Sequence, residues 1–161
     1  MSNVRPIETR YKSYQFRSRL EARWGVFFDR MGIPWEYEAD GFRTSHGGYL
    51  PDFRLFGCLF AEVKPLVHIE SAFPKLLAFV QETGLDLLLL VDTPDETWYS
   101  VLRRDGDDWL DFGWSAEKGR PWLAYCGPER PDPGYLLDSG RFRDAISAAR
   151  SARFEHGETP R

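Results

Sequence analysis

The chain has 161 residues, of which 42% are hydrophobic and 16% aromatic, and its formal net charge at pH 7 is −4. This length and apolar content exclude a disordered chain and predict a single folded domain over residues 1–161. The net charge excludes a uniformly basic protein, although residues 1–23 hold more Arg and Lys than Glu and predict a basic arm on an acidic body.

Two features of the sequence concern its compartment. Cys58 and Cys126 lie among apolar residues without metal-binding spacing, which predicts two buried thiols in a reducing compartment. The first residues form no apolar signal region, and no run approaches the ~18 apolar residues of a membrane span. We therefore expect a cytoplasmic protein without a membrane partner.

The first predicted helix spans residues 14–31, because its apolar residues recur at helical spacing and Gly32 followed by Pro34 ends it. Its apolar set consists of Leu20, Trp24, Phe27, Phe28 and Met31. Residues 34–38 alternate between apolar and polar types, which predicts a half-buried strand.

The next segment predicts a hairpin. Gly47-Gly48 indicates a turn, and two short strands follow at about residues 49–55 and 59–66, joined at Gly57. Each of these strands carries a carboxylate among apolar residues, which a purely structural hairpin does not need.

A second helix is predicted over residues 71–83, with Ser71 as its N-cap and Gly84 at its end. The apolar run at residues 85–92 then predicts a strand buried on both faces of a sheet. The order α-β-β-β-α-β defines a compact core of about residues 14–92.

An extension of about residues 93–161 follows this core. It predicts strands at 97–103 and 109–113 joined through Asp105-Gly106, a further strand at about 121–126, and a C-terminal helix with Ser139 as its N-cap. Its tryptophans, Trp98, Trp109, Trp114 and Trp122, predict a second small core. The expected fold is a mixed α+β domain with a β-rich extension and a terminal helix.

The three charges of the hairpin predict a chemical site. With a turn centred on Gly57, Asp52 lies opposite Glu62, and Lys64 shares their face of the sheet. Opposed carboxylates repel each other unless a cation, a shared proton or water intervenes. Mg²⁺ binds one or two carboxylates together with water and phosphate oxygens, which fits metal-assisted hydrolysis of a phosphodiester. The alternative is a solvated sheet face with a Glu–Lys pair.

Glu21 is a candidate fourth member of this site. It lies seven residues before Phe28 and therefore on the flank of the buried face of its helix, where it could complete a metal shell. The alternative is an ordinary salt bridge with Arg17, one helical turn away.

Three features in this order resemble the signature of the PD-(D/E)XK nuclease superfamily: Glu21, Pro51-Asp52 and Glu62-Val63-Lys64. The α-β-β-β-α-β order is also similar to the common core of that superfamily, the restriction-endonuclease-like fold. The surrounding sequence resembles small nuclease-like proteins of phages and bacterial genomes, and the relation of helix glutamate to hairpin resembles phage enzymes that resolve branched DNA.

The resemblance implies a role for each of these residues. Asp52 and Glu62 would bind Mg²⁺ or Mn²⁺, Glu21 would be an accessory ligand, and Lys64 would assist the attacking water. It also implies that the protein could pair as a homodimer to cut both strands.

Basic residues near the site predict contacts with DNA. Arg17 and Arg19 belong to an arm that interleaves cations with aromatic residues, and Lys75 opens the second helix. The alternatives are a solvated arm and a plain surface lysine.

We therefore expect a Mg²⁺-dependent DNA endonuclease, with branched DNA as one candidate substrate. The alternative is a catalytically inactive adaptor of the same fold that binds DNA or a protein. The aromatic C-terminal half is in addition a candidate surface for a protein partner.

Overall fold

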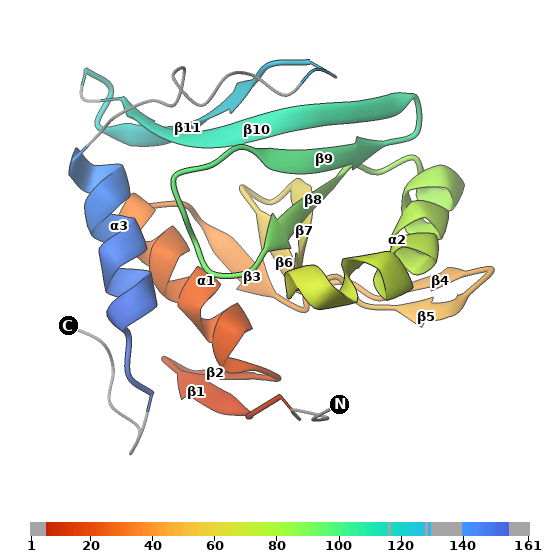
Figure 1. The fold of residues 1–161 in the computed structure, drawn as a ribbon, viewed down its shortest axis with the longest axis horizontal. Helices are drawn as coiled ribbons and strands as arrows, with labels where there is room; N and C mark the ends of the chain where they lie inside the picture. Colours follow the sequence, from red (N-terminus) through yellow and green to blue (C-terminus); the bar gives the residue numbers. More distant parts are fainter. Residues whose placement is uncertain (1–5, 116, 128, 130–139, 155–161) are drawn as a thin grey trace.

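A computed structural model of the protein describes residues 6–115, 117–127, 129 and 140–154. These residues form a mixed α+β fold in which a curled seven-stranded sheet is accompanied by three α-helices and two small hairpins (Figure 1). Among them, no helix is both long enough and apolar enough to cross a membrane.

The helices are α1 (Arg19–Met31), α2 (Ile69–Thr83), which follows the 3-10 turn η1 (Leu66–His68), and α3 (Gly140–Ser151). The strands of the sheet, in spatial order, are β11 (Arg120–Tyr125), β10 (Gly106–Ser115), β9 (Tyr99–Arg103), β8 (Leu87–Val91), β7 (Leu59–Lys64), β6 (Phe53–Leu55) and β3 (Trp35–Tyr37). The separate hairpins are β1 (Thr9–Tyr11) with β2 (Tyr14–Phe16), and β4 (Phe42–Thr44) with β5 (Gly47–Tyr49).

The sheet strands follow the predicted order of helix, three strands, helix and strand, but the strand predicted at 49–55 is shorter, because Tyr49 ends β5 and only Phe53–Leu55 form β6. After α1, the strands β3, β6 and β7 pair antiparallel, and α2 then connects β7 to β8, which is parallel to it. The predicted register around Gly57 is confirmed, because Phe53 pairs with Ala61 and Leu55 with Leu59. The β4–β5 hairpin is inserted between β3 and β6 and pairs with neither of them.

Both helices of the core begin elsewhere than predicted. The first starts at Arg19 and not at residue 14, because Ser18 has an extended backbone and its hydroxyl accepts the Glu21 N–H at 3.1 Å, which makes it an N-cap. The preceding residues 14–16 form β2 instead. The second helix starts at Ile69, so Ser71 is not its N-cap; the Ser71 hydroxyl donates to the His68 carbonyl at 3.1 Å.

The two ends predicted for these helices are confirmed. Gly32 and Gly84 both follow the last helical residue in the left-handed conformation, with φ of 71° and 72°. The predicted turn at Gly47-Gly48 is wrong, because both glycines belong to β5 and the chain reverses at Ser45 and His46.

The sheet has a core on each face, because successive residues of β7 and β8 point to opposite sides. Ala61 and Val63 pack with α1 and α3, whereas Phe60 and Leu87 pack with α2. Figure 1 shows α1 and α3 lying together and α2 apart from them. The functional candidates of β7 therefore lie at one end of a strand that is covered on both faces.

The extension continues the sheet and does not build a separate core from its tryptophans. The predicted β9–β10 hairpin and β11 are present, and Phe112 and Phe142 join the core formed by α1 and α3. Trp98 is buried outside a strand, whereas Trp122 is 38% exposed. The predicted N-cap Ser139 lies outside the described residues.

The prediction of two buried thiols is wrong, because Cys58 and Cys126 are both exposed. Cys58 ends the turn between β6 and β7, and Cys126 directly follows the last residue of β11. Apolar neighbours in the sequence do not bury a residue that lies where a strand ends.

Candidate active site

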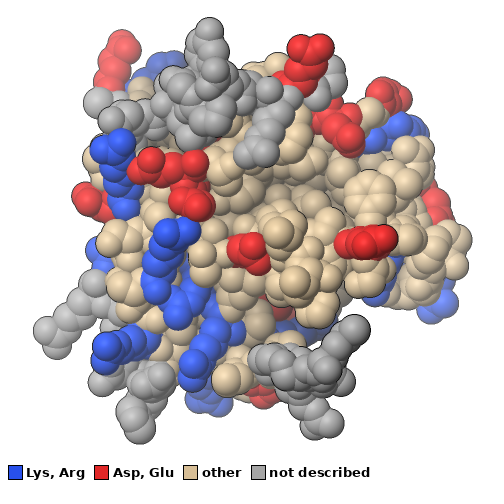
Figure 2. All heavy atoms as spheres, in the orientation of Figure 1, with Lys and Arg blue, Asp and Glu red and all other residues tan. Residues whose placement is uncertain are grey.

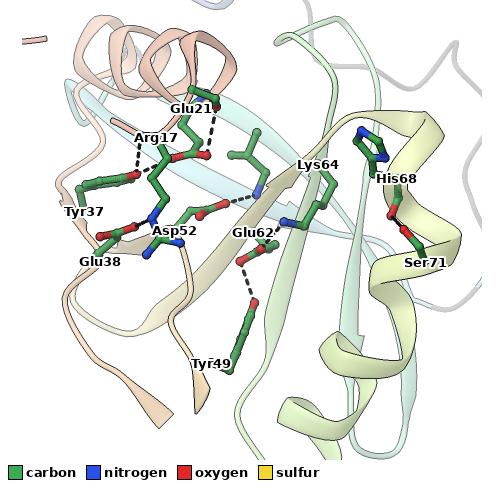
Figure 3. Close-up of polar contacts among 12 residues, drawn as sticks. Arg17, Glu21, Tyr37, Glu38, Tyr49, Asp52, Glu62, Lys64, His68 and Ser71 are labelled. Atoms are coloured by element: carbon green, nitrogen blue, oxygen red, sulfur yellow. Dashed lines mark hydrogen bonds and ion pairs between the residues drawn. The ribbon is translucent and has the colours of Figure 1, made fainter. Parts of the chain in front are cut away.

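The four predicted site residues line one cavity of about 740 Å³. Glu21 comes from the first turn of α1, Asp52 directly precedes β6, and Glu62 and Lys64 belong to β7 (Figure 3). The carboxylates are the deepest members, since Asp52 is 5% exposed and Glu62 4%. The predicted alternative is therefore wrong about a solvated face, because both acids are buried, whereas its Glu–Lys pair is present between Glu62 and Lys64.

Asp52 takes the place of a backbone partner at the end of the β6–β7 ladder. Its Oδ2 accepts the Val63 N–H at 2.8 Å, while its own carbonyl accepts the Glu38 N–H at 2.8 Å. Because the strands pair about Gly57, this position lies next to Glu62, as the register predicts. The carboxylate is thus fixed by main-chain groups of neighbouring segments.

Each carboxylate oxygen of Glu62 contacts a different side chain. Lys64 Nζ lies 2.9 Å from Oε1, and the Tyr49 hydroxyl donates to Oε2 at 2.8 Å. Glu62 and Lys64 are two residues apart on β7 and so share a face. Burial raises the pKa of Tyr49, and the charge of Glu62 raises it further, so the hydroxyl stays a donor.

Glu21 is oriented by two hydroxyl groups and not by the arginine one turn away. The Ser18 hydroxyl donates to Oε1 at 3.0 Å, and the Tyr37 hydroxyl donates to Oε2. Arg17 lies outside α1 and pairs with Glu38, with Nε and Oε1 2.6 Å apart. The predicted alternative for Glu21, a salt bridge with Arg17, is therefore wrong.

The electrostatics of the cavity favour a bound proton or cation. Burial raises the pKa of Asp52 well above its usual range, and the charges of Glu62 and Glu21 add to this effect. Burial also raises the pKa of Glu21, although its hydrogen bonds from Tyr37 and Ser18 oppose the rise. Lys64 is the cation beside the three carboxylates and Arg17 acts on Glu21, which leaves the negative charge of these buried acids only partly compensated.

Lys64 stays protonated in this environment. Burial alone lowers the pKa of its ammonium group, but the neighbouring carboxylates, Glu62 first among them, reverse the direction and raise it. The side chain therefore acts as a cation and hydrogen-bond donor at the rim of the cavity.

The donor set suits a hard divalent cation in its chemistry. Mg²⁺ takes carboxylate oxygens and keeps several waters, so Asp52 and Glu62 would suffice as protein ligands. Within the described part of the chain, however, no three His, Cys, Asp or Glu side chains are arranged to hold a metal as they stand. The oxygens of Glu21 and Glu62 are turned to hydroxyl groups and to Lys64, so metal binding would have to replace some of these contacts.

Two of the three predicted DNA-binding residues lie at the site. Arg17 and Lys75 line the same cavity, whereas Arg19 is exposed and does not line it. Three further lining or supporting residues were missed: Arg43, Tyr49 and Tyr37. The tyrosines contact carboxylates from distant segments, for which the sequence holds no local signal, and Arg43 lies beside residues that indicated only a turn.

A second group of cations covers α1 and α3, where Lys and Arg gather on the left of the face in Figure 2. Internal contacts engage several of them: Arg143 pairs with Glu96, Arg150 with Asp95, and Arg23 donates to the Ala149 carbonyl. The buried Phe142, Ile146 and Ala149 dock α3 on the body. These contacts give the α3 arginines a structural role.

Comparison of the chain with protein-family models, curated proteins and solved structures gives no match. A function therefore has to be inferred from the residues of the site.

Proposed function

We propose that the protein is a Mg²⁺- or Mn²⁺-dependent DNA endonuclease with a restriction-endonuclease-like core. The observation that carries this proposal is that Glu21, Asp52, Glu62 and Lys64 line one cavity. The antiparallel strands β3, β6 and β7 after α1, and the crossover through α2 to the parallel β8, support the fold part of the proposal.

The resemblance to the PD-(D/E)XK superfamily assigns the acids to the metal and the lysine to the water. A metal ion held by Asp52 and Glu62 would act as a Lewis acid and offset the charge that develops on the scissile phosphate. Asp52 is suited to this role because Val63 fixes one of its oxygens, and Glu62 because Tyr49 and Lys64 orient its carboxylate.

Lys64 contributes as a donor in this proposal. Its raised pKa keeps it charged, so it can hydrogen-bond the attacking hydroxide or a phosphate oxygen but is poorly suited to accept the proton of the water. The buried Glu21, with its raised pKa, lines the same cavity and offers a second anchor for the cation or its waters.

A plasmid nicking assay tests the proposal. We expect wild-type protein to nick supercoiled DNA with Mg²⁺ or Mn²⁺, and Asp52→Asn and Lys64→Met to lose this activity. The exposed residues Asp107 and Lys118 provide matched controls, since Asp107→Asn and Lys118→Met make the same changes away from the cavity. Equal nicking by the site variants and the wild type would overturn the proposal.

A second candidate function is a metal-free adaptor of the same fold that binds DNA or protein. The observation in its favour is that both oxygens of Glu21 and of Glu62 already have internal partners. Calorimetric titration separates the two functions: heat from Mn²⁺ with wild type but not with Asp52→Asn supports the nuclease. Retained DNA binding without any metal binding supports the adaptor.

A further inference from the structure

The β4–β5 hairpin forms one wall of the cavity although it belongs to no larger sheet. Its strands pair only with each other, with Phe42 opposite Tyr49 and Arg43 opposite Gly48. The cavity is lined from this segment by Gly41, Phe42, Arg43, Gly48, Tyr49 and Leu50. The hairpin therefore faces whatever occupies the site.

The hairpin is anchored at both ends, so its position is defined. At its base, the ring of Phe42 packs edge-on against Phe60 and Phe79, with centroids 5.3 and 5.0 Å apart. At its tip, the Ser45 hydroxyl donates to Glu82 of α2 at 2.6 Å. These contacts, together with the Tyr49–Glu62 hydrogen bond, tie the hairpin to α2 and to the carboxylates.

Two glycines of this wall are required neither by steric crowding nor by backbone conformation. A Cβ added to Gly41 or Gly48 would meet no atom within 4 Å, and neither residue has a positive φ. By contrast, the fold requires glycine at two other positions. Gly47 has a φ of 97°, and a Cβ at Gly25 would lie 3.2 Å from Phe16. Where neither a crowded neighbour nor a positive φ requires a glycine, its bare backbone suits a surface that another molecule approaches closely.

Arg43 lies between these glycines and is available to an outside anion. It pairs across the ladder with Gly48, so no side chain stands opposite it. Within the part of the chain that the structure describes, Arg43 has no carboxylate partner, in contrast to Arg17 with Glu38 and Arg54 with Glu36. Lys75 of α2 supplies a second cation to the cavity, with Nζ 5.5 Å from the centre of the Tyr49 ring.

We propose that Gly41, Arg43 and Gly48 form a docking strip for the sugar-phosphate backbone of the DNA strand that enters the site. The proposal rests on the nuclease function and names how that site holds its substrate. The bare backbone at the two glycines lets the strand lie close, while the Arg43 guanidinium forms a bidentate contact with one phosphate and Lys75 neutralises another. The strip reads phosphates and not bases.

Filling the strip tests the proposal without disturbing the fold. Gly48→Val places a side chain where the strand would lie, and Gly140→Val is the matched control, because Gly140 also has no neighbour within 4 Å and no positive φ but lies on α3. Binding of a fluorescein-labelled duplex and four-way junction is measured in EDTA, where no strand is cut. We expect Gly48→Val to keep or raise Tm and to weaken DNA binding about tenfold or more, and Gly140→Val to bind as wild type.

The salt dependence of binding isolates the role of the cation. Arg43→Gln should reduce the slope of log K against log salt by about one, which corresponds to the loss of one phosphate contact. Arg120→Gln, an exposed arginine on β11, is its control and should leave the slope unchanged.

The outcomes separate this proposal from the nuclease function. Wild-type affinity and slope in Gly48→Val and Arg43→Gln overturn the docking strip, even when wild-type protein nicks DNA. Loss of binding in these two variants alone supports the strip, even when no metal produces nicking, in which case the nuclease function fails instead. Absence of DNA binding by the wild type, or an equal loss in Gly140→Val, overturns the strip.

Discussion

Buried acids occur both in the cavity and on β10, and Asp108 of β10 differs from the acids of the cavity in its neighbours. In the cavity, Asp52 and Glu62 lie near a third carboxylate, Glu21, and near one lysine. On β10, Asp108 is equally buried, but its carboxylate accepts the Trp109 N–H at 2.8 Å and the Gly127 N–H at 2.7 Å. Arg103 pairs with it as well, with Nη1 and Oδ2 2.7 Å apart.

Burial of an acid does not by itself indicate a function. The negative charge of Asp108 meets two backbone donors and an arginine, so the carboxylate stabilises the end of the sheet. The acids of the cavity instead lie near one another: burial raises the pKa of Asp52 and of Glu21, the neighbouring carboxylates add to this rise, and the group is left short of positive charge. Only the acids of the cavity gain by binding a cation.

The largest expected effect separates the two sets by activity. We expect Asp52→Asn and Glu62→Gln each to lower the nicking rate by about 100-fold or more, because each change removes a negatively charged oxygen from the proposed metal site. Asp108→Asn should keep the wild-type rate per folded molecule in the same plasmid assay. A comparable loss in Asp108→Asn would show that the comparison does not identify the active site.

At β10, loss of the buried acid should lower the stability of the protein and leave its activity per folded molecule unchanged. We expect Asp108→Ala to lower the free energy of unfolding by about 1–3 kcal/mol, because two backbone N–H groups and Arg103 lose a charged acceptor. Urea unfolding monitored by circular dichroism measures this loss. The exposed neighbour Asp107, changed to Ala, is the control and should stay near the wild type; equal stability of the two variants would contradict the structural role.

The pH dependence of stability should differ at Asp52. Because its folded-state pKa is raised, the folded protein holds this proton more tightly than the unfolded chain does. The resulting stabilisation is complete below the ordinary aspartate pKa and is lost as pH rises through the raised folded pKa. Asp52→Asn, which keeps an oxygen for the Val63 N–H, should therefore gain in Tm relative to the metal-free wild type as pH rises. The measurement is thermal unfolding in EDTA from about pH 5 to about pH 8, the range in which most proteins are maximally stable.

For Asp52→Asn the exposed control is Asp107→Asn, whose Tm difference from the wild type should not change with pH. A constant Tm difference for Asp52→Asn as well would mean that the Asp52 carboxylate is not destabilised by its neighbours.

The smallest effect concerns the orientation of Glu21. The Tyr37 hydroxyl donates to its carboxylate and opposes the rise of its pKa, so Tyr37→Phe should raise the pKa of Glu21 further. We expect the acid limb of the nicking rate to move to higher pH, with a change of only a few-fold at the optimum. Tyr14→Phe, which alters an exposed ring on β2, should leave the pH profile in place; an unmoved profile in Tyr37→Phe would exclude this role.

The sequence predicts the hairpin of the site well because its information is local. The position of the turn at Gly57 between two apolar runs is enough to specify which residues pair, and the register follows from it. The start of α1 was also readable, because Ser18 and Glu21 have the spacing of a capping box. The spacing of the apolar residues alone places the start at residue 14 and overlooks this capping signal.

Other features depend on contacts between distant segments and could not be read in this way. Tyr37 and Tyr49 reach Glu21 and Glu62 only after β3 and the β4–β5 hairpin are in place. The exposure of Cys58 and Cys126 likewise follows from where strands end. A single sequence thus identifies the charged members of the site more readily than the residues that orient them.

The separation of the β4–β5 hairpin from the sheet has a consequence for how such a protein can diversify. Its inner residues make no ladder hydrogen bonds with β3 or β6, so a change there does not shift the register that aligns Asp52 with Glu62. As long as Phe42, Ser45 and Tyr49 keep their contacts, the other residues between 43 and 48 can change without moving the sheet. Replacement of these residues therefore changes one wall of the cavity while the alignment of Asp52 with Glu62 is kept.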